Sequence, residues 1–229
     1  MSLKTQMVRI KTHYRTISSF QKKIIIWWYK NKRDFPWRNT TEPFNILIAE
    51  MLLRKTTAKQ VNNIYEYFIR RYNSPKLLSK AKKNELEKIL LPLGMEHRRA
   101  ELLIRLASEI LKKHKGIVPD TYKYLIQLPG VGKYTGNSVM CFSFNKDVPV
   151  VDTNFIRIIE RVFSKKPEKS RAREDKEIWN FAQILVPKKK FKEFNWAVLD
   201  FGALVCKAKK PKCMTCCLNG ICQYYKGNS

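Results

Sequence analysis

One short stretch of the sequence combines a turn that could bind an anion with a carboxylate that could act nearby. The turn Leu128–Gly132, LPGVG, joins two helix-like runs, and Asp152 follows Gly132 by twenty residues. Glycine adopts positive φ at little cost and lets another backbone approach closely. Such a turn exposes amides at the start of the next helix, where the helix dipole favours an anion. An ordinary packing corner between two helices is the alternative.

The residues of this turn are therefore candidates for binding a phosphate, with Lys133 adding a full positive charge. The predicted contacts are Gly130, Val131, Gly132, Lys133 and Thr135. Asp152 precedes another helix-like run, where an aspartate is also a good N-cap. Capping is thus the structural interpretation of Asp152, and it is compatible with a chemical role because a helix N-terminus favours the ionised carboxylate.

A second group of candidate residues is a cysteine cluster near the end of the sequence. Its spacing is C-x6-C-x2-C-x5-C, formed by Cys206, Cys213, Cys216 and Cys222. Four thiolates on one compact loop can hold a tetrahedral metal or an iron–sulfur cluster. Zinc competes on ligand type alone. Four protein ligands leave no open position, so the site is expected to be structural. Cys217 is interpreted as a bystander and Cys141 as a small core residue.

Composition narrows the class of protein. The 229 residues are 44% hydrophobic and 12% aromatic, which indicates a folded chain rather than a disordered one. Lys and Arg number 46 against 19 Asp and Glu, a net charge of +27. That excess exceeds what solubility requires and favours a polyanion such as nucleic acid as partner. A lysine-rich surface kept for solubility is the alternative.

The hydrophobic pattern has a helical period and no persuasive strand alternation, so we predict an all-α fold. Expected helices include Ser19–Asn31, one opened by Pro43, Arg98–Lys113, Lys133–Phe144, one from Asp152 to Phe163, and Phe194–Val205. Residues 1–23 are either a basic arm or a first helix. The sequence has no secretory signal and no apolar run long enough to span a bilayer. We expect a cytoplasmic, nucleoid-associated protein whose cysteines are thiols or ligands.

Together these motifs resemble the helix-hairpin-helix DNA glycosylases that include endonuclease III and the adenine glycosylase MutY. The likeness is closest to the archaeal thymine mismatch glycosylase branch, and it covers nearly everything from Arg33 onward. The matching stretches are RDFPWRNTTEPFNILIAEMLLRKTTA, LPGVGKYTGNSVMCF, VVDTNFIRIIERVF and FNWAVLDFGALVCKAKKPKC. The resemblance implies a [4Fe-4S] cluster on the four cysteines of the 206–222 loop.

The resemblance also implies two helical domains that flank a DNA-binding cleft. Residues 36–146 would form a six-helix domain with the hairpin, while residues 1–35 and 147–229 would form a discontinuous domain with the cluster loop. Patterning alone could not have indicated a chain that leaves a domain and re-enters it.

Asp152 matches the catalytic aspartate of the family, which stabilises positive charge on the sugar as the bond to the base breaks. Family members that also cut the strand use a lysine where Tyr134 stands, and a phenol cannot form a Schiff base. Lys133 is turned by about 100° from that position. We therefore predict a monofunctional enzyme with Tyr134 in the base pocket; packing is the alternative role for Tyr134.

Glu50 matches the acid that protonates the purine in MutY-like enzymes. For a pyrimidine it would contact the polar edge of the base or hold water, and a solvated helix carboxylate is the alternative. Arg54 and Lys55 lie at the family's inserting position, where one of them would fill the gap left by a flipped base. Either residue could instead bind phosphate.

Thymine or uracil opposite guanine is the substrate that this likeness favours. The sequence ends seven residues after Cys222, so we expect no further domain for reading oxidised guanine, and the lysine of the oxidised-pyrimidine enzymes is absent. Another monofunctional specificity, including adenine, and a non-enzymatic DNA-binding module are the alternatives. The expected partner is double-stranded DNA with a mismatch. We expect the protein to act as a monomer and not to bind a membrane.

Overall fold

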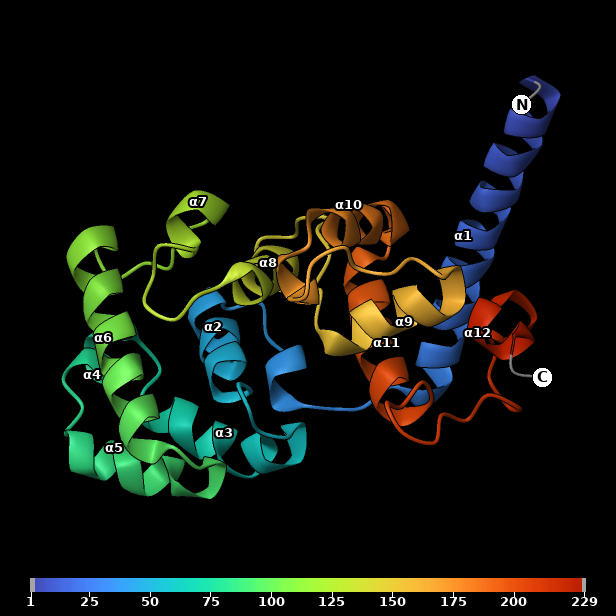
Figure 1. Cartoon of the computed structure of the whole chain (residues 1–229). Helices are drawn as coiled ribbons and strands as arrows, with labels where there is room; N and C mark the ends of the chain where they lie inside the picture. The colour runs from blue at the N-terminus through green and yellow to red at the C-terminus, as the bar shows by residue number, and fades with distance from the viewer. Residues whose placement is uncertain (1–2, 228–229) are drawn as a thin grey trace. The chain divides into compact units, whose positions relative to one another are not determined.

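The computed structural model describes residues 3–227, with side chains from residue 14 onward, and every regular element in this part of the chain is helical. The predicted all-α fold is therefore confirmed for the described residues (Figure 1). The α-helices are α1 (Leu3–Asn31), α2 (Pro43–Leu52), α3 (Ala58–Arg71), α4 (Pro75–Ser79), α5 (Lys83–Leu90), α6 (Glu96–His114), α7 (Tyr122–Leu125), α8 (Lys133–Phe142), α9 (Thr153–Phe163), α10 (Lys176–Leu185), α11 (Phe191–Leu204) and α12 (Gln223–Lys226). Short 3-10 helices are η1 (Pro36–Arg38), η2 (Leu91–Leu93), η3 (Ala172–Glu174) and η4 (Asn219–Ile221).

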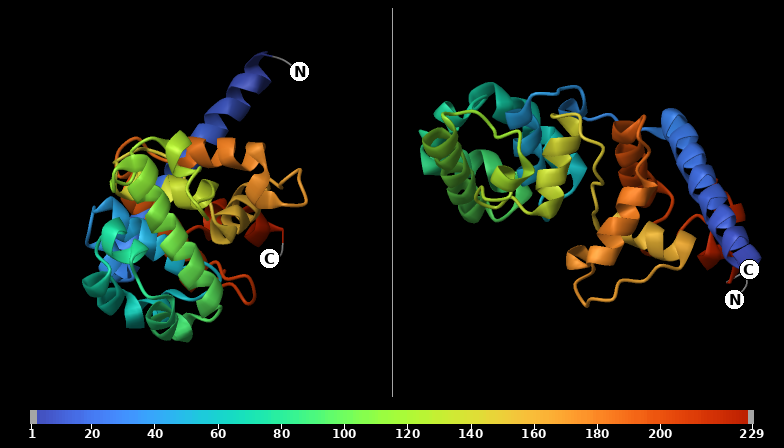
Figure 2. Two further views of the ribbon diagram at one scale, coloured as in Figure 1. Left: turned by 90° about the vertical axis from the view of Figure 1, so that its left-hand side faces the viewer. Right: turned by 90° about the horizontal axis from the view of Figure 1, so that it is seen from above.

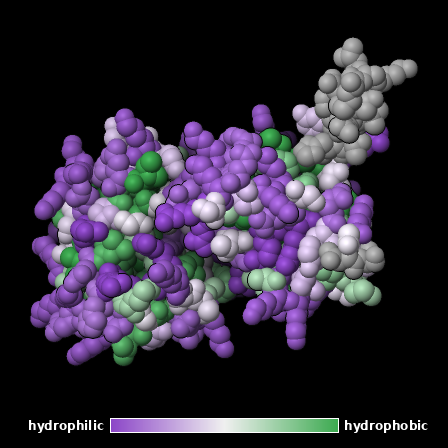
Figure 3. All heavy atoms as spheres, viewed as in Figure 1, coloured by the Kyte–Doolittle hydropathy of each residue, from purple (hydrophilic) through white to green (hydrophobic). Residues whose placement is uncertain are grey.

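The chain divides into two compact units. The central unit is Asp34–Lys146, and the terminal unit combines Met1–Arg33 with Asp147–Ser229. The division after Arg33 lies two residues before the predicted division after residue 35, and the division after Lys146 coincides with the predicted one. Hydrophilic residues cover most of the face drawn in Figure 3, in keeping with the high charge.

In the central unit, amphipathic helices bury their apolar faces against one another. Helix α6 packs against α4 and α5, and α2 packs against α8 and α3. The apolar stripe predicted for the helix that Pro43 opens is buried, with Phe44, Leu47 and Leu52 at 3% exposed or less. Removing such side chains from water is the main stabilising contribution to a helical core.

In the terminal unit, α1 runs beside α11, and α9 packs against α10, α11 and α12 (Figure 2). Ile17, Phe20, Ile24 and Trp28 form the buried stripe of α1, with the spacing of one helix face. The N-terminal helix therefore shares one core with segments that lie more than a hundred residues later in the chain.

A buried carboxylate fixes the end of α1 in this unit. Asp200 of α11 is fully buried and accepts hydrogen bonds from the Trp28 indole at 3.0 Å and from the Arg33 backbone N–H at 3.1 Å. The Arg33 Nε also donates to it, at 2.6 Å. A buried charge is tolerated when it is paired and hydrogen-bonded in this way.

Several observed helix boundaries differ from the predicted ones. Helix α1 begins at Leu3 rather than near Ser19, so the helical alternative for the N-terminal region is the one observed. Helix α8 ends at Phe142, two residues earlier than predicted, while α11 begins at Phe191, three residues earlier. Among the residues that the structure describes, no helix is long and apolar enough to cross a membrane.

Candidate functional site

The turn Leu128–Gly132 is tight because Gly130 adopts a positive φ, a conformation that favours glycine. Gly130 has φ of 78°, and an added Cβ would lie 2.8 Å from Met51 and 2.9 Å from Arg54. The Val131 N–H closes the turn by donating to the Leu128 carbonyl at 3.0 Å. Gly132 has φ of −98° with open space around it, so it does not use the positive-φ freedom expected of both glycines.

Helix α8 starts immediately after this turn and presents the predicted anion contacts. Gly132 is its N-cap residue, and the amides of a helix's first turn have no partner within the helix. Lys133 is exposed, whereas Thr135 is buried at 5% exposed. The Thr135 hydroxyl is therefore turned into the unit, and its backbone N–H is the group that could face a phosphate.

The loop between α2 and α3 is tied to the turn. Arg54 Nη1 donates to the Gly130 carbonyl at 3.2 Å, while Lys55 is exposed and has φ of 53°. A capping box of Thr57 and Gln60 then starts α3. A lysine in the left-handed region is strained, and such strain is concentrated at functional sites. Lys55 is the freer of the two candidates for insertion into DNA.

Arg99 and Met95 were missed by sequence reasoning. Arg99, 6% exposed, donates through Nε to the Gly94 carbonyl at 2.8 Å and through Nη1 to the Leu52 carbonyl at 3.1 Å, and Nη2 donates to the Arg54 carbonyl. It thereby joins the loop before α6 to the loop after α2. The available signal was the position of Arg99 on the apolar face of α6, one turn before the buried Leu103.

Met95 lies on the loop that Arg99 holds. It has φ of 55° and is 42% exposed, so an apolar side chain is held outward in a strained conformation. Lys55 and Met95 line one pocket of about 200 Å³. The other residues lining it are Met51, Leu52, Arg54, Arg98, Arg99, Leu102 and Leu103. Two strained, exposed side chains thus stand at the rim of one cationic pocket.

Glu50 is buried, at 6% exposed, and accepts a hydrogen bond from the Ser138 hydroxyl of α8. The alternative of a solvated helix carboxylate is therefore wrong, because the packing of α2 on α8 covers this side of the helix. Tyr134 lies in the first turn of α8 and is half-buried. Burying a carboxylate costs free energy unless it is hydrogen-bonded. The buried Glu50 is therefore a candidate for function.

Asp152 of the terminal unit is the N-cap of α9, as predicted. Its Oδ1 accepts from the Phe155 N–H at 2.8 Å, and its Oδ2 accepts from the Asn154 side-chain amide at 2.7 Å. Burial raises the pKa of Asp152, and these donors, together with the charge of Arg157, lower it in opposition. The carboxylate is thus held in one orientation, with its charge supported by N–H groups.

A chain of hydrogen bonds runs from Asp152 to the cysteine loop. Arg157 Nη2 donates to Asn154 Oδ1 at 2.7 Å and to the Gly202 carbonyl at 2.9 Å, and its Nε donates to the Cys206 carbonyl at 2.8 Å. An added Cβ at Gly202 would lie 2.4 Å from the Asn154 Cβ. Gly202 therefore permits the close approach of α11 to α9 on which Asn154 depends.

The four predicted ligand cysteines, Cys206, Cys213, Cys216 and Cys222, line one pocket. Arg161 closes it from α9, donating through Nη1 to the Lys207 carbonyl at 2.7 Å and to the Cys206 Sγ at 3.5 Å. Cys217 is not among the lining residues, and its Sγ lies 4.0 Å from the Lys23 carbonyl. Cys141 is buried in the central unit, in agreement with its predicted core role.

The four thiols line one pocket without converging on a single point. Four sulfurs bound to one zinc ion at about 2.3 Å lie within about 3.8 Å of one another. In the part of the chain described, no three Cys, His, Asp or Glu side chains converge in a way that could hold a single ion. Four cysteines that line one pocket supply the thiolate donors that a four-iron cluster takes, one cysteine to each iron.

Comparison with known proteins assigns this arrangement to a family. A family model described as "HhH-GPD superfamily base excision DNA repair protein" matches residues 48–183. A thymine/uracil-DNA glycosylase of Pyrobaculum aerophilum is 47% identical over 88% of this chain and 90% of that protein. A thymine-DNA glycosylase of Aeropyrum pernix is 44% identical over 89% and 93%. A solved structure of a thermostable thymine-DNA glycosylase matches with a TM-score of 0.88 and 38% identity over 94% of this chain and 99% of that one.

Proposed function

Because the chain belongs to the HhH-GPD superfamily of base excision DNA repair proteins, it is a DNA glycosylase, and we propose that it removes thymine or uracil mispaired with guanine. The reaction hydrolyses the N-glycosidic bond and leaves an abasic site in an intact strand. The likeness to thymine/uracil-DNA glycosylases over about nine-tenths of both chains is the observation that carries this substrate.

Tyr134 supports the proposal that the strand stays intact. A phenol cannot form the Schiff base through which an amine would open the sugar and cut the DNA. The neighbouring Lys133 is exposed, and one step along a helix turns it by about 100° from Tyr134. Tyr134 would instead contact the extruded base.

Asp152 is proposed as the catalytic carboxylate. As the bond to the base breaks, positive charge develops on the sugar, and a carboxylate nearby stabilises that charge and orients the incoming water. The hydrogen bonds from Phe155 and Asn154 hold the carboxylate in place and favour its ionised form. Glu50, buried beside Ser138, would contact the polar edge of the pyrimidine.

DNA binding is proposed for the turn and the loops tied to it. The amides from Gly130 to Thr135 and the Lys133 ammonium would bind a backbone phosphate, as helix N-termini commonly do. Lys55 and Met95 would fill the space that the extruded base leaves, one with a charged and one with an apolar side chain. Arg54 would keep its bond to the Gly130 carbonyl and position the turn.

Cys206, Cys213, Cys216 and Cys222 are proposed to hold a [4Fe-4S] cluster, which when bound acts as a structural staple for the loop. We also take the two compact units to be the two domains of the enzyme, acting as a monomer on a mismatched duplex. Iron and sulfide analysis of the purified protein tests the cluster: bound zinc without iron would reject it.

The experiment that tests the substrate measures release of free base from three duplexes, which carry G:T, G:U or A:G mismatches. The proposal predicts release of thymine and uracil and no release of adenine. Release of adenine alone would move the enzyme to the specificity of its adenine glycosylase relatives, of which one from Mycobacterium tuberculosis is 32% identical. Binding without any base release would indicate a DNA-binding module.

A further inference from the structure

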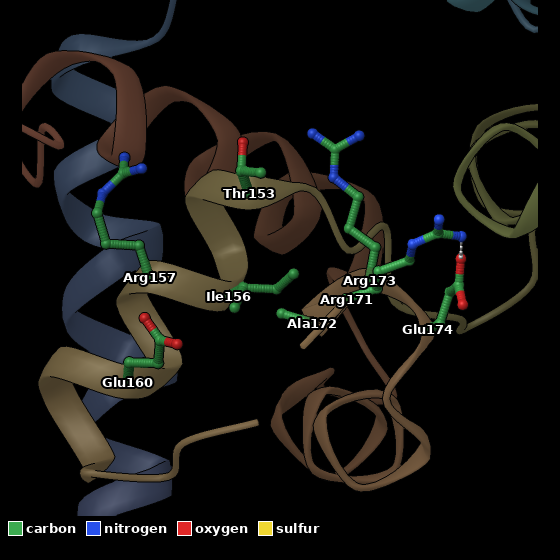
Figure 4. Close-up of a pocket in the computed structure, with 8 residues that line it drawn as sticks. All are labelled: Thr153, Ile156, Arg157, Glu160, Arg171, Ala172, Arg173 and Glu174. Carbon is green, nitrogen blue, oxygen red and sulfur yellow. Dashed lines mark hydrogen bonds and ion pairs between the residues drawn. The ribbon is translucent and has the colours of Figure 1, made fainter. Parts of the chain in front are cut away.

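A pocket of about 460 Å³ on the terminal unit is lined by Thr153, the residue that follows Asp152 in the chain. Helix α9 forms one wall and the loop through η3 forms the other (Figure 4). The side chains of Ile156 on α9 and Ala172 on η3 point toward one another across the pocket. The remaining lining residues are Arg157, Glu160, Arg171, Arg173 and Glu174. Three arginines against two glutamates give it an excess of positive charge.

The charged groups of this pocket are not equally available. Arg157 is committed to Asn154 and to the carbonyls of α11, and Arg171 is paired with Glu174 at 3.4 Å. The Arg173 guanidinium is exposed and has no ion pair or hydrogen bond to any residue that the structure describes. Figure 4 shows this guanidinium and the Thr153 hydroxyl extending to the same side of the pocket.

The loop that carries Arg173 is firmly anchored. Asp175 is buried, at 2% exposed, and accepts from the backbone N–H groups of Glu168 at 2.6 Å and Lys169 at 2.9 Å. The Trp179 indole donates to the Arg173 carbonyl itself at 2.8 Å. A cationic side chain is therefore held on a preorganised backbone, which reduces the entropy lost when it binds a ligand.

We infer that Thr153 and Arg173 bind a DNA backbone phosphate next to the extruded nucleotide. This rests on the proposed function, in which Asp152 approaches the sugar of that nucleotide. The phosphates are bonded to the same sugar, and Thr153 directly follows Asp152 in the chain. A hydroxyl and a guanidinium at one rim suit a phosphodiester. Glu160, two turns further along α9 than Thr153, makes its end of the pocket unfavourable for an anion and leaves the rim at Thr153 and Arg173 as the site.

The test combines a protein variant with neutralised phosphates. Duplexes contain guanine opposite a stable abasic-site analogue, and each carries one uncharged methylphosphonate linkage at a different position. Dissociation constants are measured for the wild-type protein, for Arg173→Ala and for Lys188→Ala. Lys188 is an exposed cation of the same unit that does not line the pocket, so it controls for the general loss of charge.

For the wild type, neutralising one phosphate adjacent to the abasic position should weaken binding about tenfold, the value of one charge-assisted hydrogen bond. Arg173→Ala should bind about tenfold more weakly on the unmodified duplex and should show no further loss at that phosphate, with a salt slope lower by about one unit. Lys188→Ala should keep the full sensitivity of the wild type.

Equal losses for Arg173→Ala and Lys188→Ala, or an Arg173→Ala variant that keeps its sensitivity at that phosphate, would overturn the inference. Base release by the wild type from a G:T duplex is measured in the same series. If the wild type releases the base but the two variants bind DNA equally well, this phosphate site alone is rejected. If the wild type releases no base, the proposed function is rejected. Unchanged melting temperatures establish that both variants are folded.

Discussion

The two carboxylates proposed for catalysis are held in different ways. Asp152 lies at a helix end, where its oxygens accept from the Phe155 N–H and the Asn154 amide. Glu50 lies inside α2, buried under α8, with the Ser138 hydroxyl as donor. N–H donors favour the charged form of a carboxylate, while a hydroxyl can also accept a hydrogen bond from a protonated one. Asp152 is thus supported by N–H groups at a helix end, whereas Glu50 is covered by helix packing and accepts from a hydroxyl.

The two sites also differ in how far their support extends. The position of Asp152 depends on Asn154, Arg157 and, through them, on Gly202 and the carbonyl of Cys206. The position of Glu50 depends on the local packing of α2 on α8. Substitutions far from Asp152 should therefore affect its site, whereas only neighbours of Glu50 should affect that of Glu50.

The largest expected effect is that of Asp152→Asn, which should lower single-turnover base release by at least about 10³-fold. DNA affinity should be unchanged, since asparagine is as good an N-cap and keeps the same shape. Burial raises the pKa of Asp152 in the folded protein above its value in the unfolded chain. The free energy of unfolding therefore decreases as the pH rises from the unfolded pKa to the folded one, and this cost is fully present above both. The variant escapes this cost at neutral pH but loses the acceptor for the Asn154 amide, so its melting temperature should stay close to that of the wild type. Retained turnover would contradict the assignment.

Glu50→Gln should reduce base release by about 10- to 100-fold, the usual contribution of proton transfer, with little change in melting temperature. Glutamine can still accept from Ser138. Ser138→Ala should instead destabilise the protein by about 1–3 kcal/mol, because it removes a hydrogen-bond donor to a buried carboxylate. Full activity in the Glu50→Gln variant would show that Glu50 has only a structural role. Asp152 would then be the only carboxylate of the two that acts in catalysis.

Gly202→Ala should disturb Asp152 from a distance. The new methyl group would lie 2.4 Å from the Asn154 Cβ, so α9 and α11 must separate at a cost of about 1–3 kcal/mol. Both the melting temperature and the rate of base release should fall. Gly220→Ala is the matched control, since nothing lies within 4 Å of its added Cβ. If the two variants behave alike, the packing at Asn154 does not support the site.

The smallest expected effect is on pH dependence. Base release requires ionised Asp152. Because burial raises the pKa of Asp152, activity should be lost on acidification at a higher pH than the value of about 3.9 at which an exposed aspartate titrates. Asn154→Ala removes a donor that lowers this pKa and should shift the acid limb to higher pH. The measurement is the single-turnover rate across acidic pH. A shift to lower pH would show that Asn154 does not stabilise the charge.

Sequence patterns predicted the features that depend on neighbours in the chain. The N-cap role of Asp152, the special conformation of Gly130 and the set of four cysteines all follow from local spacing. The all-helical class follows from the period of apolar residues. These features could be inferred because each is determined within a few residues of chain.

Features determined across the fold could not be inferred in this way. Arg99 bonds to carbonyls about 45 residues earlier in the chain, and Gly202 makes room for Asn154 of another helix. Both partnerships exist only after the helices have packed. Glu50 illustrates the same limit, because its burial depends on α8 and not on the pattern of α2 itself.

The central claim, that the bond to the base breaks while the strand stays whole, is tested most directly with an end-labelled G:T duplex. After incubation with the protein, one half of the sample is analysed under neutral conditions and the other after hot alkali. The account predicts full-length thymine strand in the neutral half and cleavage at the mismatch only after alkali. Cleavage in the neutral half, with a borohydride-trapped protein–DNA adduct, would contradict it.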